Sequence, residues 1–420
     1  MNDGGALAGI RVLDLSRVLA GPWATQIMGD LGAEVIKIER PGSGDDTRAW
    51  GPPDFKEAGY SAYYASANRN KRSVTVDIGK PPGQQLIAAL AQKSDVLVEN
   101  YKVGSAARHG LDYATLSKLN PRLIYCSITG FGQTGPYAPR AGYDAMIQGM
   151  GGLMSITGRP RAEPGSGPQK VGVAMVDLST GLYAAIAVLA ALVQRARTGR
   201  GQHIDLALLD VAVAMLAYQG MNYLATGTAP DRPGNAHPSI VPYQDFPTQD
   251  GWMMLAVGND AQFAHFCHCV DHPEWSADAR FATNPQRVAN RKLLVELITA
   301  ITTARATREW ITLLEAAGVP CGPINDIASV FADPQVKARE LNVAISPGTA
   351  APAGAAEAAV ADRAAGPSVR GIASPLRLSA APVDYRLPPP ALGAHTRAVL
   401  REVLALSDAQ IDALAQQGAI

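Results

Sequence analysis

Asp177 is the residue of this 420-residue sequence best placed for covalent chemistry. It stands at the start of a long apolar stretch that is typical of a buried helix. The partial positive charge of a helix N-terminus keeps a carboxylate ionised, and a carboxylate can attack an acyl carbon and divide one difficult transfer into two easier steps. The commoner role of an aspartate at this place is an N-cap, and one side chain can serve both roles.

A local excess of positive charge is the second feature with chemical meaning. Its members are Lys37, Arg40, Arg48, Arg69, Lys71 and Arg72. Arg and Lys suit phosphate oxygens, so the cluster can clamp a nucleotide-like ligand. A solvated charged face is the alternative, and the residue types alone favour neither interpretation.

The segment Gly130–Gly135 spells G-x-G-x-x-G after an expected strand. A dinucleotide site needs a helix to begin there and an acidic residue about 20 positions later. Pro136 and Pro139 interrupt any such helix, and the acidic residue is missing. We therefore expect a turn above a strand end and no nicotinamide or flavin site.

Cysteine and histidine residues give no metal-binding pattern. Cys267, His268 and Cys269 are adjacent and lack the usual C-x₂₋₄-C spacing, so we expect a helix surface and no metal. His237 lies in a loop between Pro233 and Pro242, where it can contact a substrate or satisfy the loop's own backbone.

Composition limits the class of protein. Thirty-seven basic residues balance 37 acidic ones, which disfavours nucleic-acid binding. Four scattered cysteines fit a reducing compartment. The longest apolar run, Gly181–Val193, is shorter than the roughly 20 residues that span a bilayer. We expect a cytoplasmic protein without a targeting segment and without nucleic-acid or membrane partners.

The elements that must position these residues alternate strand and helix. Short apolar runs predict strands at residues 10–15, 34–38, 73–78, 95–98, 123–128 and 203–208. Helices are expected between them, including a long one after Asp177 that ends at Gly199, and another long helix is expected after the strand at 203–208. This order predicts an α/β fold with a mostly parallel sheet covered on both faces. A strand at 252–257 and the following helices predict a smaller α+β domain, and residues 228–248 and 346–375 are expected to be loops or connections.

Several ordered motifs together identify a family resemblance. They are Gly9–Ser16, Ala20–Pro22, Leu31–Arg40, Asn70–Ser73, Asp95–Tyr101, Gly130–Gly132, Gly135–Pro136, Thr198–Gln202, Gly318–Pro323 and Leu392–Thr396. The sequence resembles, nearly end to end, the class III CoA-transferases, the family of formyl-CoA transferase and carnitine CoA-transferase. The resemblance implies a large Rossmann-like CoA-binding domain of residues 1–215 completed by 335–420, a small domain of residues 225–330, and an interlocked homodimer.

The same resemblance implies a mechanism and a site. Asp177 would attack an acyl-CoA, pass through mixed-anhydride and aspartyl-CoA thioester intermediates, and transfer CoA to an acceptor carboxylate. Coenzyme A thioester is then a substrate, and no permanently bound cofactor or metal is expected. The matched CoA-binding positions are Leu19, Ala20, Arg40, Lys71, Arg72, Val76, Asn100, Tyr101 and Arg108. The matched substrate-binding positions are Tyr143, Asp144, Gly234, Asn235 and His237.

Two departures guide the choice of reaction. The related α-methylacyl-CoA racemases carry a histidine base where this chain has Tyr143, so transfer is favoured over racemisation. The loop Gly234–Gln244 lacks the glycine run of formyl-CoA transferases and, like Val330–Val336, is similar to succinyl-CoA:glutarate CoA-transferases. We expect succinyl-CoA as donor and a short dicarboxylate as acceptor. Malate, itaconate, an aromatic acid, a racemase or epimerase, and a non-catalytic acyl-CoA binder remain alternatives.

Overall fold

A computed structural model describes residues 5–346 and 368–420 of the chain. The chain divides into two compact units. The larger unit contains Met1–Leu153, Val171–Leu224 and Gln335–Ile420, and the smaller contains Met154–Lys170 and Ala225–Pro334. Most of the connection expected at 346–375 lies outside the described residues.

A six-stranded sheet with the order β5-β2-β1-β6-β7-β8 forms the centre of the larger unit, and every neighbouring pair is parallel. Its strands are β1 (Arg11–Asp14), β2 (Glu34–Glu39), β5 (Lys71–Thr75), β6 (Val96–Glu99), β7 (Ile124–Thr129) and β8 (His203–Ala207). The α/β fold class expected from the alternating pattern is confirmed. Strand order reverses between β1 and β6, where open parallel sheets place their ligand sites.

Both faces of this sheet are covered. Successive strand residues enter two different apolar clusters: Val12 and Val96 pack on one side, and Leu13 and Leu97 on the other. This alternation follows from the two-residue period of a strand. The first face is covered by α1 (Ala20–Asp30), α6 (Asp144–Met150), α8 (Met175–Thr198) and α9 (Leu208–Ala214). The second face is covered by α3 (Pro81–Gln92), α5 (Tyr113–Leu119), α17 (Thr396–Leu404) and α18 (Asp408–Gln416).

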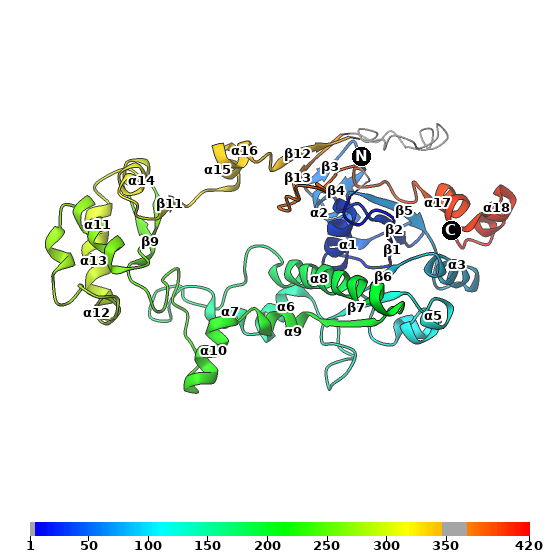
Figure 1. Cartoon of the computed structure of the whole chain (residues 1–420), viewed down its shortest axis with the longest axis horizontal. Coiled ribbons are helices and arrows are strands. Elements are labelled where there is room, and N and C mark those ends of the chain that lie inside the picture. The colour runs from blue at the N-terminus through cyan, green and yellow to red at the C-terminus, as the bar shows by residue number, and fades with distance from the viewer. Residues whose placement is uncertain (1–4, 347–367) are drawn as a thin grey trace. The chain divides into compact units, whose positions relative to one another are not determined.

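The C-terminal part returns to the start of the fold. In Figure 1 the red helices α17 and α18 lie beside α3 and β5. The side chain of Asn70 holds this return in place: its Oδ1 accepts from the backbone N–H of Arg386 and Leu387, and its Nδ2 donates to the Asp384 carbonyl. The Asn70–Ser73 motif therefore has a structural role in joining the two ends of the chain.

Helix α8 is the longest helix of the described chain and carries Asp177 in its first turn. It ends at Gly199, which takes the left-handed conformation as the sequence predicts, and Arg195 and Arg197 lie in its last turn, where cations suit the helix dipole. By length and composition alone α8 could also cross a membrane. In this fold it packs against α1 and β7.

The remaining short elements of the larger unit are η1 (Asp46–Ala49), β3 (Asp54–Phe55), β4 (Tyr60–Ser61), α2 (Ala62–Ser66), α4 (Ser105–Arg108), α16 (Pro334–Ala338), β12 (Asn342–Ile345) and β13 (Val369–Ile372). Strands β12 and β13 pair antiparallel, so part of the expected 346–375 loop is strand. Helices α7 (Leu153–Ile156) and α10 (Ala217–Thr226) lie where the chain passes between units.

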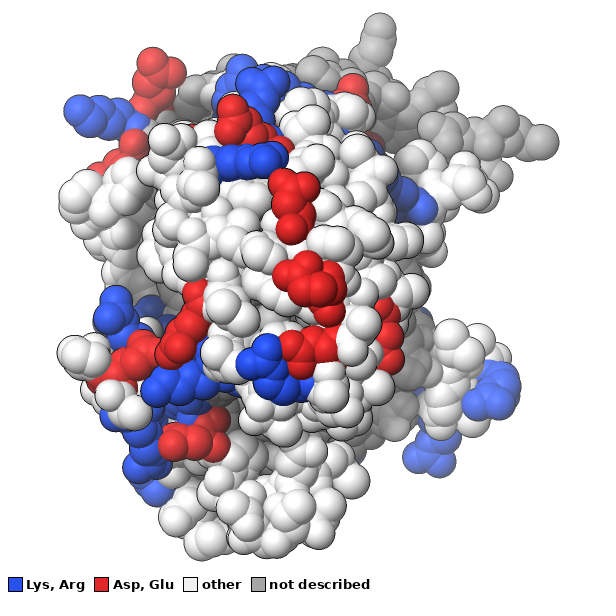
Figure 2. Space-filling view, turned by 90° about the vertical axis from the view of Figure 1, so that its left-hand side faces the viewer, with Lys and Arg blue, Asp and Glu red and all other residues white. Residues whose placement is uncertain are grey.

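The smaller unit has its own core around an antiparallel sheet of order β11-β10-β9. Its elements are β9 (Tyr243–Pro247), β10 (Trp252–Ala256), α11 (Asp260–Cys269), η2 (Pro273–Ser276), α12 (Asn284–Ala289), α13 (Arg291–Thr302), α14 (Thr307–Ala316), β11 (Cys321–Pro323) and α15 (Ile327–Ala332). Figure 2 shows acidic and basic side chains interspersed on the face it presents. Within the smaller unit, Arg280 pairs with Asp278 at 2.6 Å.

Two expectations about secondary structure are wrong. Residues 243–247 were expected in a loop but form β9, because their backbone pairs with β10 from Tyr243 to Pro247. The helix expected after β8 is broken into α9 and α10 near Ala217, whose φ of 44° lies in the left-handed region.

Candidate active site

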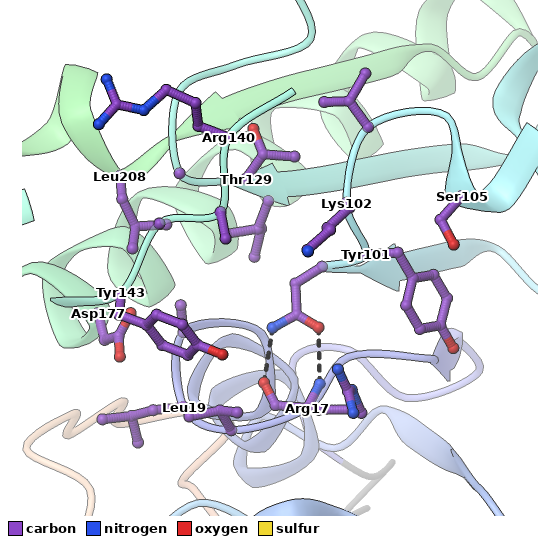
Figure 3. Close-up of a pocket in the computed structure, with 18 of the residues that line it drawn as sticks. Arg17, Leu19, Tyr101, Lys102, Ser105, Thr129, Arg140, Tyr143, Asp177 and Leu208 are labelled. Atoms are coloured by element: carbon purple, nitrogen blue, oxygen red, sulfur yellow. Dashed lines mark hydrogen bonds between the residues drawn. The ribbon is translucent and has the colours of Figure 1, made fainter. Parts of the chain in front are cut away.

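A pocket of about 680 Å³ opens in the larger unit at the carboxyl ends of the central strands. Its walls come from the segments after β1, β6 and β7 and from the start of α8. Seven of the residues expected in the site line it: Leu19, Ala20, Asn100, Tyr101, Arg108, Tyr143 and Asp177. In Figure 3, Asp177 and Tyr143 lie at one end of the pocket, and Tyr101 and Ser105 lie at the other. The topological switch point of the sheet is thus where these residues meet.

Asp177 is half-buried on the pocket wall, in the first turn of α8. The N-cap of this helix is Ala174, so the expectation that Asp177 itself is the cap is wrong. Among the residues that the structure describes, no Lys or Arg forms an ion pair with Asp177. The other acid on the pocket wall, Asp46, pairs with Arg17 at 2.9 Å.

Asp144 supplies the cap that α8 otherwise lacks. Its Oδ1 accepts hydrogen bonds from the backbone N–H of Val176 at 2.8 Å and of Asp177 at 3.1 Å. These are two of the helix-terminal N–H groups that have no partner inside the helix. Asp144 therefore lies behind the start of α8 and is not one of the residues lining the pocket.

Burial, together with the neighbouring charge of Asp144, raises the pKa of Asp177 to about 7. A raised pKa disfavours the ionised form in the folded protein, so the carboxylate that forms near neutral pH is poorly stabilised. Burial likewise raises the pKa of Tyr63 to about 12, with further contributions from Asp177, Asp144 and Asp45. Tyr63 thus keeps its phenolic proton near this acidic cluster.

Two close backbone approaches shape the pocket around Asp177. A Cβ added at Gly181, one turn along α8, would lie 2.7 Å from the Ala20 carbonyl oxygen, so only glycine lets α8 approach α1 here. A Cβ at Gly130 would lie 2.6 Å from the Cα of Gly142, where the segment before Tyr143 crosses the end of β7. The first glycine of the G-x-G-x-x-G segment therefore serves this crossing, in a loop after β7.

The turn after β1 is strained and clamped. Val18, a β-branched residue, has a φ of 71°, a left-handed conformation that is a genuine outlier for its type. Asn100 holds the preceding residue from both sides: its Oδ1 accepts from the Arg17 backbone N–H at 2.9 Å, and its Nδ2 donates to the Arg17 carbonyl at 2.7 Å (Figure 3). The Asn100 amide is thus occupied in positioning the turn that carries Leu19 and Ala20.

Four cations line the pocket: Arg17, Lys102, Arg108 and Arg140. Only Arg108 was expected from the sequence. Arg17 and Lys102 follow the ends of β1 and β6, the two strands between which the strand order reverses. Ligand sites of open parallel sheets lie at this point, so the positions of Arg17 and Lys102 after these two strands could have identified them as pocket residues. Arg140 stacks over the rings of Phe131 and Tyr137, with its guanidinium carbon 5.1 Å and 4.6 Å from their centroids.

The cation-rich N-terminal cluster makes internal ion pairs. Lys71 is fully buried, and its Nζ donates to Asp14 at 3.0 Å, to the Pro22 carbonyl and to Asn68. Lys37 is equally buried and pairs with Asp45 at 2.9 Å. Burial alone would raise the pKa of Asp14, but Lys71 and Lys37 lower it to about 2. The structure thus gives these lysines internal partners beneath the pocket.

The other expected CoA-binding residues also lie away from the pocket lining. Arg40 is exposed, Val76 is buried in the apolar cluster with α3, and Arg72 pairs with Glu34 and Glu402. None of the three lines the pocket.

The expected substrate residues 234–237 belong to the smaller unit. Gly234 and Asn235 line a second pocket, of about 750 Å³, within that unit. The Nδ1 of His237 accepts from the Ser239 backbone N–H, and its ring lies 5.4 Å from that of Tyr243. In the same unit Cys267 is buried on α11, and no cluster of three metal-ligating side chains occurs in the described part of the chain.

The sequence and the structure of this chain are similar to those of several known proteins. The model of CoA-transferase family III matches residues 7–396. The chain is 48% identical to the succinate–glutarate CoA-transferase of Agrobacterium fabrum, covering 94% of this chain and 95% of that protein. It is 45% identical to the succinyl-CoA:glutarate CoA-transferase of Homo sapiens, covering 100% and 91%. The crystal structure of a CAIB/BAIF family protein from Brucella suis is similar with a TM-score of 0.81 and 47% identity, covering 95% of this chain and all of that one.

Proposed function

The chain belongs to CoA-transferase family III and is an enzyme of that family, and from this premise we propose that it moves CoA from succinyl-CoA to glutarate or another short dicarboxylate. Two relatives named for succinyl and glutaryl chemistry, at 48% and 45% identity over most of both chains, support this choice.

The observation that carries the proposed mechanism is the environment of Asp177. Its carboxyl group is half-buried on the pocket wall, without a cationic partner in the described chain, and has a pKa raised to about 7 by burial and by Asp144. A carboxylate that is poorly stabilised in its ground state is a good nucleophile once ionised. Lys102 and Arg108 on the same pocket can attract the phosphates of CoA.

The transfer then proceeds through four displacements. An Asp177 oxygen attacks the thioester carbon of the donor, the C–S bond breaks, and CoA leaves as a thiolate while a mixed anhydride forms. The thiolate attacks the Asp177 acyl carbon and releases the donor acid, giving an aspartyl-CoA thioester. The acceptor carboxylate attacks this thioester and expels the thiolate, which finally attacks the acceptor's acyl carbon and frees the Asp177 carboxylate.

No proton moves in these steps, so the mechanism requires no base at Tyr143. A racemase would need proton transfer at the α-carbon. Tyr143 is 67% exposed on the pocket wall and carries a phenol, which is a poor base at neutral pH.

The test is a mass-spectrometric screen for transfer. The purified protein is incubated with succinyl-CoA and a pool of carboxylic acids, and each new acyl-CoA is identified. We expect glutaryl-CoA, or the CoA thioester of another short dicarboxylate, to dominate. Deuterium wash-in at the α-carbon of an acyl-CoA without any acceptor acid would instead support a racemase, and CoA binding without either reaction would support a binder.

We also propose that the enzyme works as a homodimer. Helix α8 leaves Leu182, Tyr183, Ile186 and Val193 between 45% and 65% exposed in a single chain. Such an apolar stripe on a long helix fits burial against a second copy. Light scattering of the eluting protein should give twice the 44.0 kDa of the chain, and a monomer would contradict the proposal.

A further inference from the structure

A series of hydrogen bonds leads from the buried side chain of Gln148 through Asp144 to the start of α8. Gln148 is fully buried on α6, one turn after Asp144. Its Nε2 donates to Asp144 Oδ2 at 2.6 Å, and its Oε1 accepts from the Val171 backbone N–H at 2.9 Å. One amide therefore joins α6 to the segment that leads into α8.

With Gln148 in place, both oxygens of Asp144 are engaged. Oδ2 accepts from Gln148, and Oδ1 accepts from the backbone N–H of Val176 and Asp177. The orientation of the carboxylate is fixed on both sides. Because residues 171–174 form neither helix nor strand, Gln148 and Asp144 together fix where α8 starts and how Asp177 enters the pocket.

The two acids differ in the hydrogen bonds that their side chains accept. Asp144 accepts from three N–H donors. Asp177 has no such donors to its side chain in the described structure, and it faces Asp144 from α6 and the phenol of Tyr63 from α2. A further negative charge placed near this pair would oppose the ionisation of Asp177.

We propose that Gln148 is a positioning residue for CoA transfer: it fixes the Asp144 carboxylate, which caps α8 and so holds Asp177 in the pocket. This inference rests on the proposed function. Because Gln148 is fully buried, it acts through the orientation of the proposed nucleophile.

Two substitutions at this position test the proposal, one through kcat and the other through the pH profile. Gln148→Met keeps the length of the side chain and removes both hydrogen bonds. We expect kcat to fall roughly 10–100-fold through misplacement of the nucleophile, with KM for succinyl-CoA within about threefold of wild type. Gln148→Glu places a carboxyl group beside Asp144. Its negative charge opposes the ionisation of Asp177, so the acid limb of the pH profile of this variant should move to higher pH.

Gln194→Met is the matched control, because the Oε1 of Gln194 is buried on α8 without a partner in the described structure. This variant should keep the wild-type profile. Unchanged kcat and pH profile in both Gln148 variants, with only thermal stability altered, would overturn the proposal. If Gln148→Met does not fold, the proposal is tested by Gln148→Glu alone: an acid limb moved to higher pH supports it, and an unmoved limb contradicts it.

Titration of the Asp177 carboxyl by carbon-13 NMR measures the shift in Gln148→Glu without turnover. A wild-type protein that transfers no CoA would contradict the proposed function, whereas an Asp177 titration unmoved by Gln148→Glu, together with an unchanged kcat in Gln148→Met, would contradict this inference. The two failures are therefore distinguishable.

Discussion

Asp144 caps the helix that carries Asp177, and its negative charge disfavours ionisation of the Asp177 carboxyl. The Oδ1 of Asp144 lies 3.1 Å from the Asp177 backbone nitrogen. The cap holds the start of α8 in place, and burial together with the negative charge of Asp144 raises the pKa of Asp177 to about 7. Asp144 thus contributes to both the orientation and the ionisation of the proposed nucleophile.

The first prediction concerns the pH dependence of turnover. The proposed mechanism needs Asp177 ionised in the free enzyme. Burial and Asp144 raise the pKa of Asp177 to about 7, so kcat/KM should rise with pH and level off above neutrality. Asp144→Asn keeps an oxygen for the two N–H groups and removes the charge. Its acid limb should move to lower pH, as measured by initial rates between about pH 5 and 9. An unmoved limb would show that Asp144 does not control the titration.

The second prediction is that the ionised Asp177 side chain lowers the stability of the folded protein. A carboxyl whose folded pKa is raised from 3.8 to about 7 binds more protons when folded, so its unfavourable effect appears as pH rises through that window. Asp177→Asn should be inactive yet more stable than wild type at pH 8, by roughly 2–4 °C in Tm for each kcal/mol gained. The gain should nearly vanish at pH 4. A variant less stable at pH 8 would contradict this account.

The third prediction separates the Asn100 clamp from general stability. Asn100→Leu removes both bonds to the Arg17 backbone and frees the strained turn at Val18. Because Leu19 and Ala20 of that turn line the pocket, we expect KM for succinyl-CoA to rise roughly tenfold, the loss of about 1.4 kcal/mol of binding.

Asn120→Leu is the control for this prediction. Asn120 makes similar side-chain bonds to the Ala91 and Ser94 carbonyls, away from the pocket. The Asn120→Leu variant should have a lower Tm than wild type and an unchanged KM for succinyl-CoA. Equal KM values in the two variants would show that the clamp has no influence on binding.

The fourth prediction distinguishes structural lysines from pocket lysines. Lys71→Met leaves Asp14 buried without its partner and should destabilise the fold by about 3–5 kcal/mol in denaturant unfolding, with KM of the folded enzyme unchanged. Lys102→Met should raise KM severalfold with stability unchanged, because Lys102 lines the pocket. A raised KM with unchanged stability in Lys71→Met would contradict this account and support Lys71 as a phosphate ligand.

The sequence predicts the larger features of this fold well. Short apolar runs predict the strands of the parallel sheet, and Gly199 predicts the end of α8. Both signals are local, because they depend on the spacing of apolar residues and on the ability of glycine to take the left-handed conformation. Strand β9 is missed because its pairing with β10 is a tertiary contact. The break at Ala217 is missed because a left-handed alanine has no signature in the sequence.

For the site, the residues that the structure brings together include Asp177, Tyr143, Tyr101 and Arg108. Lys71 was expected to bind CoA because it belongs to the cation-rich cluster and matches a CoA-binding position of the family. Only the fold shows that Asp14 and Asn68 enclose it. The role of Gln148 could not be predicted, since it depends on two hydrogen bonds between segments distant in sequence.

Trapping the acyl-enzyme tests the central claim most directly. The wild-type protein is mixed with succinyl-CoA without acceptor, treated with hydroxylamine, digested, and searched by mass spectrometry for an aspartyl hydroxamate. The account predicts the modification at Asp177, dependent on the CoA donor and absent from Asp177→Asn. A hydroxamate at another residue, or none while the same preparation transfers CoA, would contradict it.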